Sequence, residues 1–122
     1  MPKCICSDTF FDMTDFKSVT FLGDSRDRLR DFPNGARYDA GQELLRVQFG
    51  GEPIDWKPMP TIGKGVREIR VSDRPGEFRV VYVTNIGNRV YVLHAFQKKT
   101  QKTPLRDLAL AKARFSLIVK ET

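Results

Sequence analysis

The sequence contains few of the residues on which many kinds of protein site depend. Its 122 residues include one His, two Cys and one Trp. A single His excludes a metal cluster built from several histidines, and it excludes a pair of histidines that exchange protons. Cys4 and Cys6 are too close for a disulfide scaffold, and no His stands near them at zinc-ligand spacing. We therefore expect inert thiols, no metal and no cofactor.

Long apolar runs are also missing. No window approaches the roughly 18 consecutive apolar residues that a membrane span needs, and the N-terminus lacks a signal-peptide pattern. The chain has neither a glycine-rich phosphate loop nor a G-x-S-x-G nucleophile motif. Its composition, 40% hydrophobic and 30% charged, is that of a globular protein. We expect one cytoplasmic domain over residues 16–122, without membrane contact, after a poorly ordered extension over residues 1–15.

Positive charge is concentrated in one half of the chain. Lys and Arg number 21 against 15 Asp and Glu, for a formal net charge of +6. Residues 1–62 carry a net charge of −2, whereas residues 63–122 carry +8. This asymmetry is typical of a polyanion partner for the basic half, although a solvated basic surface has the same composition.

The first half of the chain predicts one strand and two helices. Residues 16–22 have the composition of an edge strand, and Asp24 and Ser25 offer N-caps for a short helix. A second helix starts at Pro33 and runs to Gly50. The two helices form an αα-hairpin that covers a sheet, and residues 51–64, with three prolines, form a loop. The apolar face of the second helix consists of Ala36, Ala40, Leu44 and Val47.

The second half predicts a β-meander and a final helix. Runs 66–72, 78–84 and 89–96 are separated by short turns, which makes them antiparallel neighbours. A last helix begins at Thr103-Pro104. The expected order is β-α-α-β-β-β-α, an α+β sandwich whose antiparallel meander sheet is covered on one face by the αα-hairpin and the C-terminal helix. The buried stripe of the last helix consists of Leu108, Ala111, Phe115 and Ile118.

Period-two alternation places charged residues inside the meander. A sheet face that carries Arg70, Arg79 and His94 would be an anion site. The alternation itself groups Glu68 with Arg70, sets Arg79 against Phe78 and Val80, and sets His94 and Phe96 against Leu93 and Ala95.

Three lysines follow the last strand. Lys98, Lys99 and Lys102 lie within five residues and lead into a helix N-terminus, which concentrates positive potential there. Arg suits bidentate contacts with a phosphodiester, and Lys suits point-charge contacts. A solvated loop is the alternative interpretation of this lysine run.

Aromatic residues near these cations, namely Tyr82, Tyr91 and Phe96, are candidates for stacking on RNA bases. For the lone His94, the alternative to catalysis is a packed, hydrogen-bonded core position.

Three segments of the basic half carry motifs in a fixed order and spacing. They are KGVREIRV at 64–71, FRVVY at 78–82 and YVLHAFQKKTQKTP at 91–104. Together they resemble the phage-derived, HigB-type branch of the RelE toxin superfamily. The upstream part, from Leu22 to Gly50, fits the same family, so the resemblance covers residues 17–118.

The resemblance implies a β-α-α-β-β-β-α fold and a type II toxin. Such a toxin is a metal-independent endoribonuclease, an mRNA interferase that cuts mRNA, commonly on the ribosome, and so inhibits translation. The implied reaction is attack of a ribose 2′-OH on the adjacent phosphate, which leaves a 2′,3′-cyclic phosphate. The implied protein partner is a HigA-like helix-turn-helix antitoxin.

The resemblance also implies roles for single residues. Arg79 matches the strand arginine that contacts the scissile phosphate, Lys98 and Lys99 match the basic pair after the last strand, and Arg70 matches a basic position on the neighbouring strand. His94 is a candidate for proton transfer. Further RNA-binding candidates are Arg67, Lys102, Tyr82 and Phe96.

Two positions depart from the family pattern. Glu68 stands where some relatives carry a basic residue, and the last helix has no counterpart of a tyrosine that some members use. The alternative hypothesis is therefore a non-catalytic RelE-like module of phage or mobile-element origin that binds nucleic acid or protein. A phage structural protein is a third hypothesis.

Overall fold

The computed structural model describes residues 16–74, 76–84, 86–99 and 101–121, and three helices and five strands lie in them. The extension expected over residues 1–15, with Cys4 and Cys6, lies outside the described residues. In chain order the elements are β1 (Ser18–Phe21), α1 (Ser25–Arg30), α2 (Asn34–Gln48), β2 (Trp56–Pro58), β3 (Val66–Asp73), β4 (Gly76–Val83), β5 (Arg89–Lys98) and α3 (Leu105–Glu121).

The strands form one mostly antiparallel sheet in the order β1-β5-β4-β3-β2. β3, β4 and β5 are antiparallel neighbours, which confirms the predicted meander. β1 lies at one edge, as predicted, and pairs in parallel with β5. At the other edge, β2 pairs with β3 inside the region that we predicted to be a loop. The surrounding prolines concealed this strand, since an edge strand tolerates proline where its backbone makes no ladder hydrogen bond.

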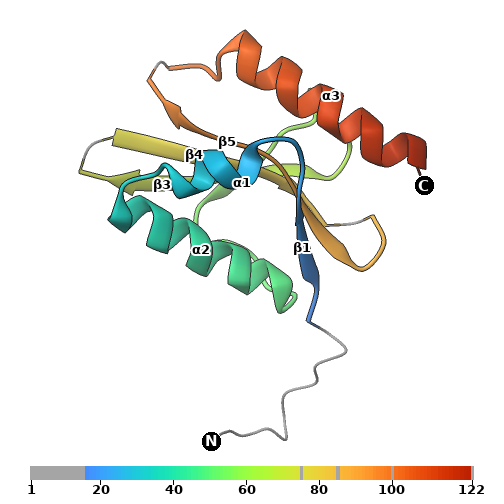
Figure 1. The fold of residues 1–122 in the computed structure, drawn as a ribbon, viewed down its shortest axis with the longest axis horizontal. Helices are drawn as coiled ribbons and strands as arrows, with labels where there is room; N and C mark the ends of the chain where they lie inside the picture. The colour runs from blue at the N-terminus through green and yellow to red at the C-terminus, as the bar shows by residue number, and fades with distance from the viewer. Residues whose placement is uncertain (1–15, 75, 85, 100, 122) are drawn as a thin grey trace, which may run out of the picture.

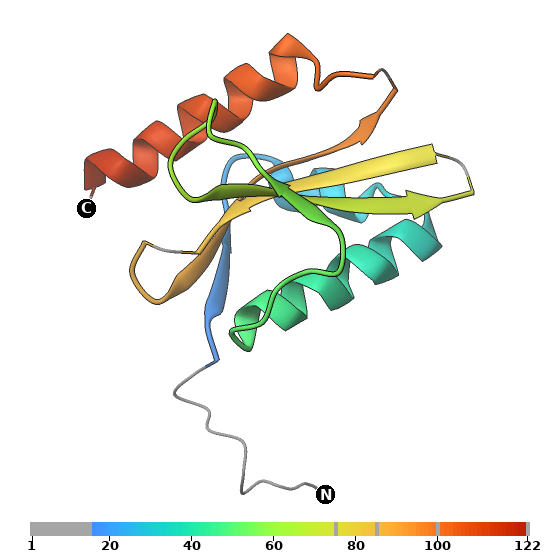
Figure 2. The same ribbon diagram turned by 180° about the vertical axis from the view of Figure 1, so that it is seen from behind.

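The helices cover both faces of the sheet, so the prediction of a single covered face was wrong. α1 and α2 lie on one side of the sheet and α3 lies on the other (Figures 1 and 2). Alternate residues of the meander explain this arrangement, because Ile69 and Val80 are apolar on one face while Val66 and Val81 are apolar on the other. Each face therefore needs its own apolar cover. None of the helices in the described part of the chain is long and apolar enough to cross a membrane.

Two hydrophobic cores result, one on each face. The predicted apolar face of α2 is buried in the first core, and the predicted stripe of α3 packs in the second. The first core contains Leu29, Phe32, Ala36, Ala40, Leu44, Val47, Ile69, Val71, Phe78, Val80, Tyr82, Val90, Val92 and Ala95. The second contains Met59, Ile62, Val66, Val81, Val83, Leu93, Phe96, Ala111 and Ile118, with Leu108 and Phe115 partly buried against it.

A β-bulge in β5 changes which residues face α3. Val81 pairs with His94 and Tyr82 pairs with Val92, so Leu93 has no partner in the ladder. Leu93 packs in the core beneath α3, whereas simple alternation predicted it on the face opposite His94. The extra residue lets neighbouring side chains point to the same side, which strict period-two counting does not capture.

Candidate functional site: a basic pocket on the sheet face that α3 covers

Four of the predicted site residues line one pocket. Arg70 comes from β3, Arg79 from β4 and Lys98 from the last position of β5, which Lys99 directly follows. With Glu77 and Gln101 they enclose about 530 Å³, and we call this set of six residues the basic pocket. The register explains the convergence, because Arg70 lies opposite Arg79 and Glu77 lies opposite Lys98. Three neighbouring strands therefore contribute charged side chains to the same pocket.

Arg79 lies at the bottom of the basic pocket and is 3% exposed. Its Nη1 donates a hydrogen bond to the Phe78 carbonyl at 2.9 Å and lies 3.4 Å from Glu77 Oε1. Its Nε lies 3.7 Å from Glu68 Oε1, and Glu68 is fully buried. Burying two opposite charges side by side is tolerated because each offsets the cost of taking the other out of water.

The other charged groups of the pocket are more exposed. Arg70 faces solvent and lies 4.0 Å from Asp55. Burial and the nearby Arg79 guanidinium lower the pKa of Lys98. The Ser72 hydroxyl donates to both carboxylate oxygens of Glu77, at 2.9 and 2.8 Å, and this contact lowers the pKa of Glu77. Glu77 is therefore a stable carboxylate, and Lys98 is the cation whose pKa moves toward neutrality.

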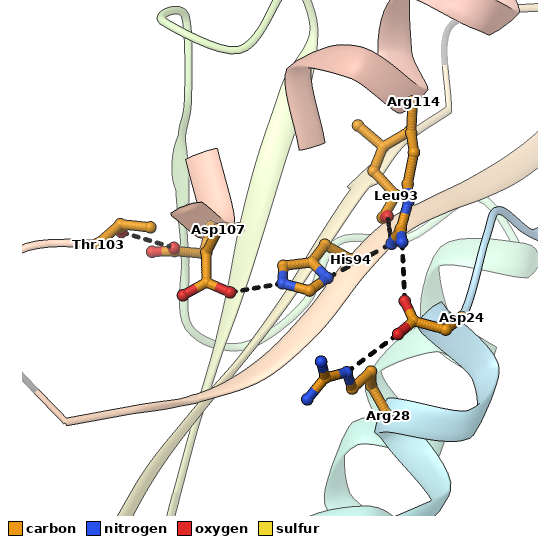
Figure 3. A network of polar contacts seen from close by, with 8 residues as sticks. Asp24, Arg28, Leu93, His94, Thr103, Asp107 and Arg114 are labelled. Atoms are coloured by element: carbon orange, nitrogen blue, oxygen red, sulfur yellow. Dashed lines mark hydrogen bonds and ion pairs between the residues drawn. The ribbon is translucent and has the colours of Figure 1, made fainter. Parts of the chain in front are cut away.

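His94, the candidate for proton transfer, lies outside the basic pocket and is the buried member of a polar network that extends to exposed residues of α1 (Figure 3). Its ring lies between two residues of α3, with Nε2 2.6 Å from Asp107 Oδ1 and Nδ1 3.4 Å from Arg114 Nη1. Arg114 Nη2 also donates to Asp24 Oδ1 at 2.7 Å, and Arg28 Nε donates to Asp24 Oδ2 at 3.1 Å. The network thus joins α1, β5 and α3.

The partners of His94 define its protonation. Because Arg114 only donates, Nδ1 accepts and Nε2 carries the hydrogen that points to Asp107. Burial lowers the pKa of His94, although Asp107 acts in the opposite direction. The neutral, enclosed ring has the features of the core position that we weighed against catalysis. Gly23, which precedes this network, has a φ of +56°, a backbone conformation that favours glycine.

The remaining RNA-binding candidates lie apart from the basic pocket. Tyr82 is 1% exposed and packs in the core beneath α2, on the opposite face of the sheet. Arg67 lies 4.0 Å over the Trp56 ring, and Lys102 is exposed between β5 and α3. Phe96 is 7% exposed and stacks on the His94 ring, with 5.3 Å between the ring centroids.

Sequence reasoning missed Glu77 and Gln101 as pocket residues. Glu77 was detectable, because it stands two positions before Arg79 in one strand and so shares its face. Gln101 lies in the lysine segment but carries no charge to mark it. Among the residues that the structure describes, no group of three or more His, Cys, Asp or Glu is placed to hold a metal ion.

Comparison with known families identifies the class of this chain. Residues 27–116 match the family described as phage-derived protein Gp49-like (DUF891), and the chain belongs to that family. It is a phage-derived family of RelE/HigB-like toxin type. The matched range includes all six residues of the basic pocket. No curated protein matches the chain.

Proposed function

We propose that this chain is the toxin of a type II toxin–antitoxin module of the HigB type. In this proposal it acts in the cytoplasm as an endoribonuclease that cleaves mRNA on the ribosome and so inhibits translation. Membership of a toxin-like, phage-derived family supports the toxin assignment. The observation that carries the endoribonuclease assignment is the convergence of Arg70, Arg79, Lys98 and Lys99 in one pocket.

The pocket suits a phosphodiester on grounds of charge and shape. Four cations and one carboxylate line it, so its net charge favours an anion. Arg79 offers a planar guanidinium held by Phe78 and Glu77, which restricts its orientation before substrate arrives. Preorganised donors of this kind stabilise the negative charge that develops on a phosphate in the transition state.

The proposed reaction is transfer of the phosphoryl group to the 2′-oxygen. The 2′-OH loses its proton, its oxygen bonds to phosphorus, the bond from phosphorus to the 5′-oxygen breaks, and the 5′-oxygen takes up a proton from water and leaves as a hydroxyl. Lys98 is the proposed proton acceptor, because its lowered pKa leaves more of it neutral than an ordinary lysine. Arg70, Arg79 and Lys99 are proposed to stabilise the charge of the phosphorane. The ribosome would hold the RNA in line for attack.

The test is to express the chain alone and to assay the purified protein on ribosomes programmed with mRNA. We expect growth arrest and cleaved mRNA with 2′,3′-cyclic phosphate ends. Lys98→Ala/Lys99→Ala should abolish both effects. Cleavage by this double variant at the wild-type rate would show that the basic pocket is not the site.

Two features favour a second candidate, a non-catalytic module that binds nucleic acid or protein. Glu68 and Glu77 place carboxylates beneath and in the pocket, where they offset the cations. The sequence of α3 also contains no tyrosine. If the wild-type chain expressed alone is harmless and translation in vitro continues at its normal rate, this second candidate replaces the toxin.

The proposed protein partner is a HigA-like helix-turn-helix antitoxin. We expect a small helix-turn-helix protein in the neighbouring reading frame, and its co-expression should restore growth. If co-expression leaves growth arrested, that protein is not the antitoxin.

A further inference from the structure

Glu68 occupies a central position beneath the basic pocket. It lies in β3 opposite Val81 of β4, and its side chain is fully buried. Its two carboxylate oxygens contact different parts of the chain. Oε1 lies 3.7 Å from Arg79 Nε, while Oε2 accepts a hydrogen bond from the Thr103 hydroxyl at 3.3 Å. One side chain therefore contacts both a pocket arginine and the segment that follows the pocket lysines.

The contact with Arg79 is electrostatic. Neither Glu68 Oε1 nor Arg79 Nε has a hydrogen-bond partner among the described residues, and the two atoms are too far apart for a hydrogen bond. A charge this deeply buried is retained where its partner compensates it. Glu68 thus attracts the inner side of the guanidinium, while Phe78 and Glu77 hold Nη1.

The second contact of Glu68 holds Thr103, which lies between β5 and α3. β5 ends at Lys98 and α3 begins at Leu105, so Thr103 belongs to the connection that follows Lys98 and Lys99. Its bond to Glu68 spans from this connection to β3, across β4. Figure 3 shows Thr103 on the connection just before α3. The bond therefore restrains Thr103, which comes four residues after Lys99.

We infer that Glu68 is a positioning residue, which sets the guanidinium of Arg79 and the lysine-bearing end of β5 relative to each other. The inference rests on the proposed function, because it assigns Glu68 to the same RNA-cleaving pocket. It also explains why a carboxylate stands beneath cations that face a phosphate. Its charge orients the Arg79 guanidinium from the buried side, and its second oxygen holds Thr103.

The main test is Glu68→Gln, which keeps the shape and an acceptor for Thr103 but removes the charge. We expect kcat for RNA cleavage to fall about tenfold, because Arg79 loses its orientation. KM should stay the same or decrease, because the pocket becomes more positive. Asp27→Asn is the matched control, since it removes one negative charge from an exposed position on α1. A merely structural role would lower the folded fraction without separating kcat from KM. An unchanged kcat in Glu68→Gln overturns the inference.

Thr103→Val tests the contact between Thr103 and Glu68. It also replaces Glu68→Gln as the test if that variant does not fold. We expect kcat to fall about threefold with an unchanged melting temperature, and the amide NMR signals of Lys98 and Lys99 to shift. Unchanged kcat and unchanged amide signals overturn the link between Glu68 and the lysines.

NMR of the arginine Nε–H groups separates this inference from the proposed function. The signal of Arg79, identified by its loss in Arg79→Lys, should move in Glu68→Gln and stay in place in Asp27→Asn. If the wild-type chain cleaves no RNA, the proposed function fails, yet the NMR test still applies. An Arg79 signal that does not move in Glu68→Gln overturns the positioning role.

Discussion

The two faces of the sheet bury different kinds of side chain. Beneath α1 and α2, β3 to β5 contribute apolar side chains and Tyr82 to a continuous core. Beneath α3, buried Glu68, Arg79 and His94 are interspersed with apolar residues, since Val81 lies between Glu68 and His94 in the sheet and Phe96 lies opposite Arg79. Neighbours in sequence show the contrast directly, since Ile69 and Glu68 are both fully buried on opposite faces.

This difference between the two faces indicates that the face beneath α3 contributes less to the stability of the fold. Buried charges contribute little to stability even when paired, whereas apolar side chains of similar size contribute about 1.5–3 kcal/mol each. A face designed only for packing would resemble the core beneath α2. The buried Glu68 and Arg79 charges are better explained by the adjacent basic pocket, because Arg79 lines that pocket and Glu68 lies beside the Arg79 guanidinium. The following predictions test this division, in order of decreasing expected effect.

Ile69→Ala tests the packing face. It removes a fully buried side chain from the core beneath α2, so we expect the free energy of unfolding to fall by about 2–5 kcal/mol. Ile69→Val should cost about 0.5–1.5 kcal/mol. Denaturant unfolding measures both values. The rate of RNA cleavage per folded molecule should stay at the wild-type value, and a large decrease would show that the faces do not divide stability from activity.

Lys98→Arg tests the chemistry of the polar face. Arginine keeps the positive charge but does not lose its proton, so a base at this position is lost. We expect the cleavage rate to fall about 100-fold, while stability changes by less than about 0.5 kcal/mol. The wild-type rate should rise with pH toward the lowered pKa of Lys98, and the variant should lack this rise. Lys99→Arg is the control. If both substitutions lower the cleavage rate equally, Lys98 contributes its charge and is not the base.

His94→Gln tests the pH dependence of the polar network. The pKa of His94 is lower in the folded chain than its ordinary value of 6.5, so the unfolded chain binds more protons as the pH falls. The free energy of unfolding should therefore decrease from about pH 6.5 downward. Asp24 and Glu77 have carboxylates with lowered pKa values, so they stop contributing to the free energy of unfolding only at more acidic pH. Unfolding measured between about pH 5 and 7 should show a flatter dependence in His94→Gln. An unchanged slope would mean that other groups cause it.

Tyr82→Phe tests whether an aromatic residue on the packing face contacts RNA. The hydroxyl is buried without a hydrogen-bond partner among the described residues, so its removal should change stability by less than about 1 kcal/mol. RNA cleavage should be unaffected. A tenfold loss of activity with normal stability would instead show that the Tyr82 hydroxyl takes part in RNA recognition.

Much of the fold was predictable from periodicity and turns. The meander, the two helices before it and the last helix all have regular apolar spacing, which local pattern reveals. β2 was not predictable, because its three residues lie among prolines and pair only through tertiary contact with β3. The face covered by α3 was not predictable either, since strands that are apolar on both sides do not specify where a helix packs.

The candidate site was predictable in part. Alternation and the family motif indicated Arg70, Arg79, Lys98 and Lys99, and the structure brings all four together. The network around His94 was not predictable, because its partner Arg114 lies 20 residues away and charged residues on a helix give no signal of pairing. Tyr82 was assigned to RNA from its residue type, whereas its strand position places it in the opposite core.

The most direct test of the account is the single-turnover rate of mRNA cleavage by Arg79→Lys on programmed ribosomes. Lysine keeps a positive charge opposite Glu68, so the buried pair is retained, but it lacks the planar group that contacts a phosphate at two points. With folding verified by the melting temperature, we expect the rate to fall at least about tenfold. Cleavage at the wild-type rate by a folded Arg79→Lys variant would contradict the assignment of RNA cleavage to the basic pocket.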